Sequence, residues 1–248
     1  MGGAAFFDLD RTMISRATPL ALAGSFRRRR LVRRRDLLRA AAWHAVFLAR
    51  GVGEREMRRA AEDGMRLLRG VPVAEVDALL ADAMERVLRP LIYAESLELV
   101  RRHHDHGEPV YLVSASLQQI VERIAEDLGL DGAIGSTCKI EDGVYTGRSL
   151  RPCYGELKAR AIRELAARDG IDLTQSTAYS DSHTDVAFLA AVGTPTAVNP
   201  DSRLRRIAVD RGWPILEFSP RAGRPRGPLG RVGRGVRARA PGKRLSLR

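Results

Sequence analysis

Two carboxylates and a hydroxyl follow a short apolar run near the N-terminus, and their spacing carries more chemical information than any other part of the chain. The run from Ala4 to Phe7 is short and rich in Phe, which predicts a buried strand that ends at Asp8-Leu9-Asp10-Arg11-Thr12. Ligands of open α/β sheets bind beyond the carboxyl ends of the strands. A turn there can aim one carboxylate and one backbone carbonyl at the same cation, which suits Mg²⁺. Taken alone, the motif fits helix capping equally well.

Three later polar clusters follow apolar runs or open helices. Pro109 to Val113 predicts a second strand, and Ser114-Ala115-Ser116 after it offers a hydroxyl and backbone N–H groups to an anion at the start of the next helix. Lys158 falls in the first turn of a predicted helix, where the macrodipole disfavours a cation, so its position indicates phosphate contact. Asp181 and Asp185 are four residues apart and share one face of a starting helix.

These residues resemble the four motifs of the haloacid dehalogenase (HAD) superfamily, and most closely its phosphoserine-phosphatase-like branch. The matching residues are Asp8-x-Asp10-x-Thr12, Ser114, Lys158 and Asp181-Ser182-x-x-Asp185. The resemblance covers residues 4 to about 217, and four ordered motifs with the right residue types are a specific signal. Leu117 stands where many relatives have Pro, and Arg11 where Lys is common. Neither departure removes a chemical group.

The resemblance implies a Mg²⁺-dependent phosphatase that hydrolyses a phosphate monoester through an aspartyl phosphate. It implies that Asp8 is the nucleophile, and that Asp10 protonates the departing alkoxide and then activates water, which requires a carboxyl pKa raised by the surroundings. By the same resemblance, the Asp8 side chain, the Asp10 carbonyl and Asp181 hold Mg²⁺, and Asp185 lies beside or just behind these ligands.

The resemblance assigns the phosphoryl oxygens to Thr12, Ser114, the backbone at Ala115 and Lys158. A phosphate monoester is a dianion that repels an attacking carboxylate until positive charge screens both, and Mg²⁺ and Lys158 would supply that charge. Phosphoryl transfer depends mainly on such positioning and electrostatic stabilisation. The substrate class stays open among a small phosphorylated alcohol, an amino-acid phosphate and a lipid phosphate.

Strands that alternate with helices after residue 92 predict an α/β fold with a doubly wound, mostly parallel sheet. About a hundred residues without a strand pattern separate the first two strands, which is too long for an ordinary crossover and predicts an inserted helical cap. We assign 1–15 and 92–218 to the catalytic core, 16–91 to the cap and 219–248 to a basic, disordered tail. The predicted elements are cap helices within 37–45, 57–68 and 76–87, core helices 93–106, 117–128, 156–168, 184–191 and 202–210, strands 4–7, 109–113, 177–180, 195–198 and 214–216, and a hairpin at 133–150.

Length and composition favour one globular enzyme in the cytoplasm. A chain of 248 residues with 44% hydrophobic content can bury a sizeable core. Cys138 and Cys153 are expected to be a reduced, buried pair rather than a disulfide. No basic-then-apolar signal opens the chain. The longest apolar stretch, 40–49, is far shorter than the roughly 20 residues of a membrane span. The oligomeric state stays open.

Positive charge is concentrated in two places. From Ser219 onward the chain carries nine Arg, one Lys and no acid, which is ten of the net +12. Its Gly and Pro content leaves no apolar face, so disorder is expected. Such a tail can attract nucleic acid, anionic lipid or an acidic partner. A solvated extension without a specific partner is the favoured interpretation, and nucleic acid is not favoured.

The second concentration, from Arg27 to Arg35, puts seven arginines into nine residues directly before the apolar stretch 40–49. Helices with that division bind anionic membrane surfaces, so peripheral membrane contact is one hypothesis. The alternative, slightly favoured, is a solvated basic face with Trp43, Val46 and Phe47 packed inside the cap.

Histidines add little to the site. His103, His104 and His106 end a predicted helix, where cations suit the dipole, so capping is favoured over metal binding. His183 lies inside the fourth motif, and its role stays open between substrate contact and support of the loop. A protein that binds phosphate, RNA or anionic lipid without catalysis is the alternative function. It has no need of a nucleophile, so Asp8 argues against it.

Overall fold

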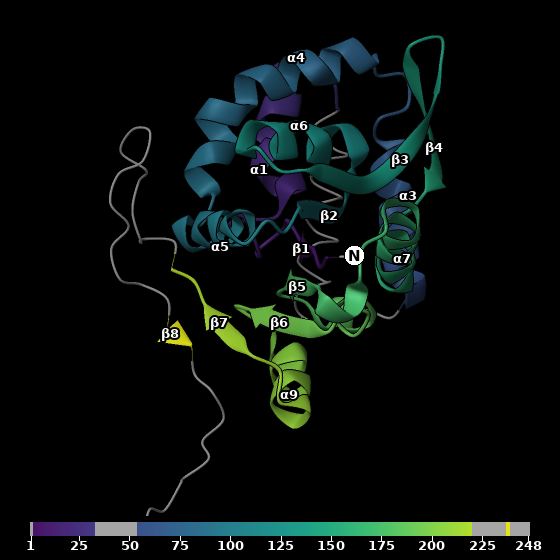
Figure 1. The fold of residues 1–248 in the computed structure, drawn as a ribbon. Helices are drawn as coiled ribbons and strands as arrows, with labels where there is room; N and C mark the ends of the chain where they lie inside the picture. The colour runs from purple at the N-terminus through teal and green to yellow at the C-terminus, as the bar shows by residue number, and fades with distance from the viewer. Residues whose placement is uncertain (1, 33–53, 220–236, 239–248) are drawn as a thin grey trace, which may run out of the picture.

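The computed structural model describes residues 2–32, 54–219 and 237–238. In this part of the chain the strands form one sheet in the order β4-β3-β2-β1-β5-β6-β7-β8 (Figure 1). The strands are β1 (Ala5–Phe7), β2 (Val110–Leu117), β3 (Gly132–Glu141), β4 (Val144–Arg151), β5 (Thr177–Ser180), β6 (Thr194–Val198), β7 (Ile215–Glu217) and β8 (Arg237–Ala238). Only β4 and β8 pair antiparallel with their neighbours. The predicted doubly wound, mostly parallel sheet is confirmed.

Alternating side chains of β1 divide the core into two layers. Ala5 and Phe7 join one buried cluster, with apolar side chains of α5 (Ala94–Asp105) and α6 (Gln118–Leu128). Phe6 joins a second cluster. Its helices are α7 (Glu156–Asp169), α8 (Val186–Leu189) and α9 (Ser202–Arg211). A strand with side chains buried on both faces reads as one continuous apolar run, as the sequence does here. Figure 1 shows α6 and α9 on opposite sides of the sheet.

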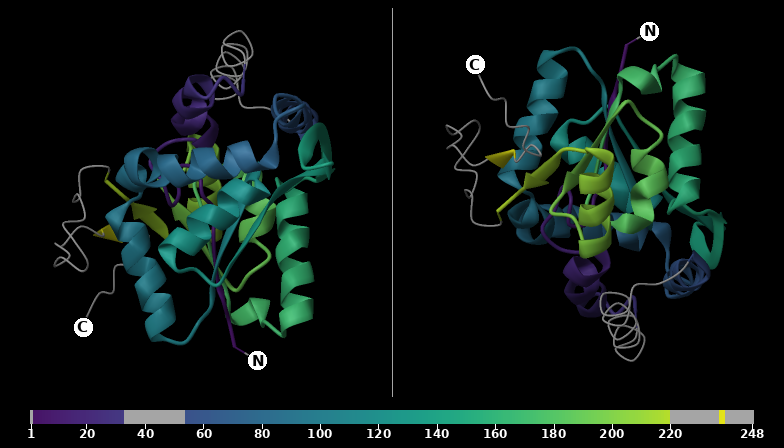
Figure 2. Two further views of the ribbon diagram at one scale, coloured as in Figure 1. Left: turned by 90° about the horizontal axis from the view of Figure 1, so that it is seen from above. Right: turned by 90° about the horizontal axis from the view of Figure 1, so that it is seen from below.

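Helices fill the described part of the predicted cap. They are α1 (Thr18–Arg28), α3 (Glu54–Arg66), α4 (Val73–Ala83), the π-helical turn η1 (Met84–Leu88) and the 3-10 turn η2 (Arg89–Leu91). Figure 2 shows α1 beside α4. The expected helix within 37–45 lies outside the described residues. The domain boundaries at 15, 91 and 218 stay predictions.

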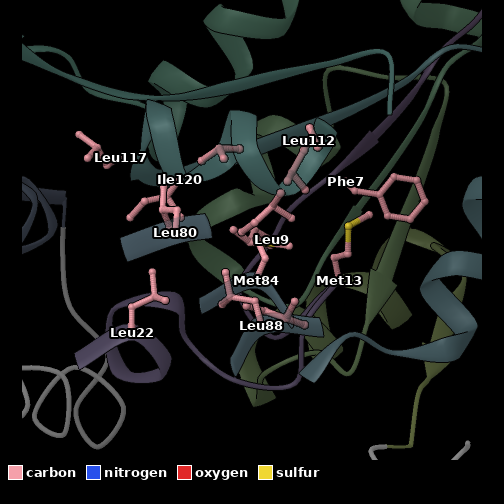
Figure 3. Close-up of a cluster of buried hydrophobic side chains, with 14 of the residues drawn as sticks. Phe7, Leu9, Met13, Leu22, Leu80, Met84, Leu88, Leu112, Leu117 and Ile120 are labelled. Atoms are coloured by element: carbon pink, nitrogen blue, oxygen red, sulfur yellow. The ribbon is translucent and has the colours of Figure 1, made fainter. Parts of the chain in front are cut away.

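Residues of the predicted cap and of the predicted core share one apolar cluster (Figure 3). Leu22 of α1, Leu80 of α4 and Met84 of η1 lie in it together with Leu9 and Met13 of the turn after β1. Leu9 and Met13 are fully buried. Burying one such side chain stabilises the fold by on the order of 2 kcal/mol. This burial therefore holds the turn that carries the predicted site residues against the predicted cap.

The β3–β4 hairpin forms a second contact with the cap. The backbone N–H of Gly70 donates to the Tyr145 carbonyl, and the N–H of Tyr145 donates to Val71, each at 2.9 Å. The N–H of Val73 donates to the Gly143 carbonyl at 2.9 Å. These bonds cover part of an edge strand, which would otherwise offer unpaired backbone groups to other chains.

Two predicted boundaries were wrong. Strand β2 continues through Leu117 instead of ending at Val113, with a register shift against β3 after Val113. A Cβ on Gly135 would lie 2.9 Å from the Ser116 carbonyl oxygen and 2.7 Å from the Gln118 Cα, so this glycine in β3 permits the close approach. The predicted helix 184–191 is the 3-10 turn η4 (His183–Asp185) followed by the single turn α8. Gly193, just after this segment, lies against the Thr174 backbone. A Cβ at this position would lie 1.8 Å from the Thr174 carbonyl oxygen, so no larger residue fits there.

Other predictions are settled in part. Cys138 and Cys153 are buried free thiols, as expected. Among the described residues, no helix has the length and apolar character that crossing a bilayer requires. Residues 33–53, 220–236 and 239–248 lie outside the description. These residues include the apolar stretch 40–49, part of the arginine run and most of the basic tail.

Candidate active site

The predicted acids come from neighbouring parallel strands. Asp8 follows β1, and its backbone N–H donates to the Tyr179 carbonyl of β5 at 2.9 Å. Asp181 follows β5 directly. From β1 the chain winds toward β2 on one side and β5 on the other, with helices on opposite faces of the two halves. Open α/β sheets bind ligands beyond the carboxyl ends of the strands at such a reversal.

Lys158 joins two of the acids. Its Nζ donates to Asp8 Oδ1 at 2.5 Å and to Asp185 Oδ2 at 2.7 Å, and its side chain is only 2% exposed. Ser180 Oγ donates to the same Asp185 oxygen at 2.7 Å. The helix that carries Lys158 begins after Gly155, whose φ of 52° and ψ of −131° only glycine adopts at low cost. The cation predicted from its unfavourable place in a first helical turn therefore lies between two carboxylates.

Burial sets the protonation behaviour of this group. Burial raises the pKa of Asp8 to about 7, against the opposing effect of Lys158, and the charges of Asp185 and Asp10 add to the rise. Burial also raises the pKa of Asp181, to which the Asp8 charge contributes. Burial lowers the pKa of Lys158, but Asp185 and Asp8 outweigh it and leave that pKa above its ordinary value. Lys158 therefore stays a cation, while Asp8 and Asp181 lack enough positive charge nearby.

Arg11 provides part of that charge. Its Nε lies 3.5 Å from Asp181 Oδ2, with the arginine side chain 45% exposed and the aspartate 7% exposed. Arg11 has a φ of 64°, which is uncommon for a residue with a Cβ and tends to occur at functional turns. The sequence analysis noted only that Arg11 stands where Lys is common, and it did not predict the contact with Asp181.

Asp10 faces the first cap helix. Its Oδ1 accepts a hydrogen bond from the backbone N–H of Thr18 at 2.8 Å and a second, short one from the Thr18 hydroxyl. Asp10 still lies close enough to Asp8 and Asp181 to raise the pKa of both.

The predicted phosphate contacts differ in their surroundings. Thr12 is fully buried, and its Oγ1 has no hydrogen-bond partner among the described residues. A buried hydroxyl without a partner calls for a ligand or a water, and a phosphoryl oxygen would satisfy it. Ser114 is buried, and its Oγ accepts a hydrogen bond from the Ser116 N–H at 3.1 Å. Because β2 continues to Leu117, Ser114, Ala115 and Ser116 lie within the strand, and α6 begins at Gln118, one residue from the predicted start.

Among the described residues, no three His, Cys, Asp or Glu side chains are grouped so that they could hold a metal ion by themselves. Lys158 already bridges Asp8 and Asp185, and the Asp10 carboxylate is turned to Thr18. What remains is two buried carboxylates, Asp8 and Asp181, whose pKa values are raised first by burial and then by neighbouring carboxylates. Their oxygens, together with the Asp10 carbonyl that the resemblance assigns, are hard donors, few in number, as Mg²⁺ prefers when it keeps its waters. The residues fit Mg²⁺.

Histidines occupy supporting positions. His183 Nδ1 pairs with Asp201 Oδ2 at 2.8 Å, and Asp201 donates its own N–H to the Asp181 carbonyl at 2.8 Å. This network braces the loop after β5. His103 Nε2 lies 2.8 Å from the Tyr179 hydroxyl, and His104 Nε2 lies 2.9 Å from Asp131 Oδ2.

Three contacts of the site were missed from the sequence: Arg11, Thr18 and Ser180. Ser180 could have been suspected, because it ends β5 directly before Asp181. Thr18 lies eight residues beyond Asp10, a spacing that matches no regular element.

Comparison with known proteins agrees with this geometry. A profile described as haloacid dehalogenase-like hydrolase matches residues 5–190. An inhibition of morphological differentiation protein of Streptomyces azureus is 44% identical over 87% of this chain and 78% of its own length. A probable phosphatase of Mycobacterium tuberculosis is 42% identical over 87% and 75%. A phosphoserine phosphatase of the same species is 36% identical over 87% and 70%.

Solved structures extend the likeness to the fold. A Bordetella pertussis protein of unknown function matches with a TM-score of 0.76 and 29% identity, covering 87% of this chain and 98% of its own. A phosphoserine phosphatase with an analogue of its phospho-aspartyl intermediate matches with a TM-score of 0.60 at 20% identity, over 83% and 90%. The motif resemblance is thereby confirmed, and the chain belongs to the haloacid dehalogenase-like hydrolase family.

Proposed function

We propose that this protein is a Mg²⁺-dependent phosphatase that forms an aspartyl phosphate on Asp8. That it is a phosphoric monoester hydrolase follows from its family and its phosphatase relatives. The observation that carries the finer proposal is the buried Asp8 carboxylate, paired with Lys158 at 2.5 Å. An ordinary structural ion pair needs neither a second buried acid, Asp181, nor a buried threonine hydroxyl, Thr12, that no described residue satisfies.

In the first step an Asp8 carboxylate oxygen attacks phosphorus, and the bond from phosphorus to the ester oxygen breaks. Lys158 neutralises charge on the phosphoryl oxygens. The Thr12 hydroxyl, which has no partner among the described residues, donates a hydrogen bond to one of these oxygens. Asp10, in its neutral form, gives its proton to the departing alkoxide. The step leaves an acyl phosphate on Asp8 and a carboxylate on Asp10.

In the second step water attacks the phosphorus of the acyl phosphate and loses its proton to the Asp10 carboxylate. The bond between phosphorus and the Asp8 oxygen breaks, which restores the nucleophile and releases inorganic phosphate. The same residue thus serves first as acid and then as base.

Mg²⁺ would be held by the side chains of Asp8 and Asp181 and by the Asp10 carbonyl, with Asp185 behind them. When bound, it would supply positive charge that lowers the repulsion between carboxylate and phosphate and stabilises the transferred group. The raised pKa values of Asp8 and Asp181 support a cation at this place, because burial without compensation is costly.

Substrate identity stays open among phosphorylated alcohols, amino-acid phosphates and lipid phosphates. Binding of phosphate, RNA or anionic lipid without catalysis is the alternative, and peripheral membrane contact through Arg27 to Arg35 and the tail is a further hypothesis. The described arginines of that run, Arg27 to Arg30, are exposed, which is compatible with such contact and equally with solvation.

Trapping the intermediate tests the proposal. The protein is mixed with Mg²⁺ and a panel of p-nitrophenyl phosphate, phosphoserine, glycerol phosphate and lysophosphatidic acid, and quenched in acid. We expect a mass increase of one phosphoryl group, mapped to Asp8 by peptide fragmentation. The label should vanish in Asp8→Asn and after treatment with hydroxylamine, which cleaves acyl phosphates.

Metal dependence is tested in the same assay. Turnover should stop after chelation and return with Mg²⁺, while Ca²⁺ should inhibit, because it accepts more oxygens and would take both oxygens of Asp8. Full activity after exhaustive chelation would reject the metal assignment. Turnover without any label on Asp8 would reject the covalent intermediate.

A further inference from the structure

The carboxylate of Asp10 is held by a residue outside the four motifs. Its Oδ1 accepts both the backbone N–H of Thr18, at 2.8 Å, and the Thr18 hydroxyl. Thr18 is fully buried and is the first residue of α1, the first helix of the cap. Both donors act on the same oxygen, so the contact fixes the orientation of the Asp10 side chain and not merely its location.

The contact also serves the helix. Residue Ala17 stands at the N-cap of α1 and offers no side-chain acceptor, so the first N–H groups of the helix need a partner from elsewhere. Asp10 provides one. A carboxylate at a helix N-terminus is also favoured by the macrodipole. Leu22, one turn further along α1, is fully buried in the cluster that cap and core share, which anchors the helix that presents Thr18.

This arrangement engages one carboxyl oxygen of Asp10, Oδ1, with both donors of Thr18. In the neutral form that the proposed first step requires, an Oδ1 that accepts two hydrogen bonds is the carbonyl oxygen, and the transferred proton is then on Oδ2. A general acid must present that proton to the leaving oxygen at hydrogen-bond distance, and misplacement by about 1 Å costs on the order of 10²-fold in rate.

We propose that Thr18 is the positioning residue of the acid–base group Asp10. It orients the proton toward the leaving oxygen in the first step. That orientation then depends on how α1 packs against the rest of the protein. The proposal rests on the function proposed above. The proton balance is unchanged: Asp10 gives its proton to the departing alkoxide, and the attacking water later restores it.

A series of leaving groups separates this role from a structural one. Thr18→Val removes the hydroxyl and keeps the shape and the backbone N–H. Its kcat/KM is measured at saturating Mg²⁺ for p-nitrophenyl phosphate, whose leaving group needs no proton, and for glycerol phosphate, whose alkoxide does. We expect a loss of about tenfold or more on glycerol phosphate and less than about threefold on p-nitrophenyl phosphate, from the loss of a hydrogen bond to a carboxylate.

Three matched variants complete the experiment. Thr18→Ser keeps the donor and should restore the wild-type ratio between the two substrates. Thr196→Val makes the same substitution at a buried position of β6, so it should leave that ratio unchanged. Thr18→Ala removes the hydroxyl with a different change of volume. Its kcat/KM should also fall more on glycerol phosphate than on p-nitrophenyl phosphate. This variant keeps the test valid if Thr18→Val does not fold.

A second readout follows the base role of Asp10. With p-nitrophenyl phosphate, hydrolysis of the acyl phosphate should slow in Thr18→Val, so more enzyme should stand phosphorylated in the steady state than in wild type. Equal losses on both substrates, or no loss on either, would overturn the proposal and make Thr18 a packing residue. Failure of the wild-type protein to hydrolyse any substrate or form any phosphoenzyme would instead reject the proposed function itself.

Discussion

Two charged regions of this protein differ sharply in how the fold treats their charges. The carboxylate cluster, Asp8, Asp10, Asp181 and Asp185, lies at the carboxyl ends of β1 and β5, and three of its four acids are less than 10% exposed. The arginine face, Arg27 to Arg30 at the end of α1, is exposed throughout. The cluster meets a buried lysine at 2.5 and 2.7 Å, whereas Arg29 meets Glu75 at 3.7 Å with both side chains more than a third exposed.

The difference teaches which charges can do chemistry. Water screens the arginine face, so its ion pairs contribute about 0–1 kcal/mol each. Burial removes that screening from the carboxylate cluster and raises the pKa values of Asp8 and Asp181, and such shifts are typical of catalytic groups. Charge density in the sequence is greater in the arginine run, yet the functional potential lies in the smaller, buried group. The predictions below run from the largest expected effect to the smallest.

Asp8→Asn should lower turnover by more than about 10⁴-fold, because an amide cannot form the acyl phosphate. Circular dichroism should show an intact fold, since Asn has the same size and can still contact Lys158. Substantial residual turnover in the purified variant would reject Asp8 as nucleophile and would remove the main functional difference between the two regions.

Asp10→Asn should slow turnover by about 10² to 10⁴, the usual contribution of a general acid–base group. Both steps of the reaction should slow, measured as phosphoenzyme formation and decay in rapid quench. An unchanged decay rate would mean that another group activates the water.

Mg²⁺ affinity should respond in opposite directions to two neighbouring changes. Asp181→Ala should weaken binding, measured by calorimetry, more than Asp185→Ala does. Arg11→Gln should tighten it by up to about fivefold, because the guanidinium 3.5 Å from Asp181 competes with the metal ion. Weaker binding in Arg11→Gln would show that Arg11 supports the metal site instead.

The metal-free protein should lose stability as pH rises through the Asp8 titration. The folded pKa of Asp8 is about 7 and its ordinary value is 3.8, so between these values the folded state holds a proton that the unfolded state has released. The stabilisation is complete below the ordinary value and lost as pH rises through about 7. The difference in Tm between Asp8→Asn and wild type should therefore grow in favour of the variant from pH 4 to 7 and level off above. A difference independent of pH would contradict the raised pKa.

The arginine face should tolerate change. Arg28→Gln with Arg29→Gln removes hydrogen bonds to Ser25 Oγ and the Ala78 carbonyl, at 2.9 and 3.1 Å, and should lower the stability by no more than about 1 kcal/mol. Activity on p-nitrophenyl phosphate should stay the same. Arg101→Gln with Arg102→Gln, on the exposed side of α5, is the matched control.

The membrane hypothesis is tested with the same variant. Protein truncated after Pro220, with and without the two substitutions, is sedimented with anionic vesicles at low salt, where electrostatic attraction is least screened. Selective loss of binding in the double variant would support a lipid surface as partner. Absence of binding in the truncated wild type would make the arginine face an ordinary solvated one.

The sequence determined the fold class and the identity of the polar groups. Short apolar runs that end in Asp8, Ser114 and Asp181 specify parallel strands, because the period of side chains and the turn residues are local properties of the chain. The order of the motifs then places those residues at one edge of the sheet. Lys158 was predicted from its unfavourable place at a helix start, a local signal as well.

Only the tertiary structure decided which groups meet and how strongly they interact. Thr18 donates hydrogen bonds to Asp10 because the shared apolar cluster packs α1 beside the turn after β1. No spacing in the sequence specifies this contact. Strand β2 continues beyond its apolar run to Leu117, and Gly135 in the neighbouring strand β3 allows the backbone at Ser116 and Gln118 to approach closely. The pKa of Asp8 depends on how deeply packing buries it. Long-range packing sets desolvation and distance, and these two quantities turn a set of acids and cations into a site.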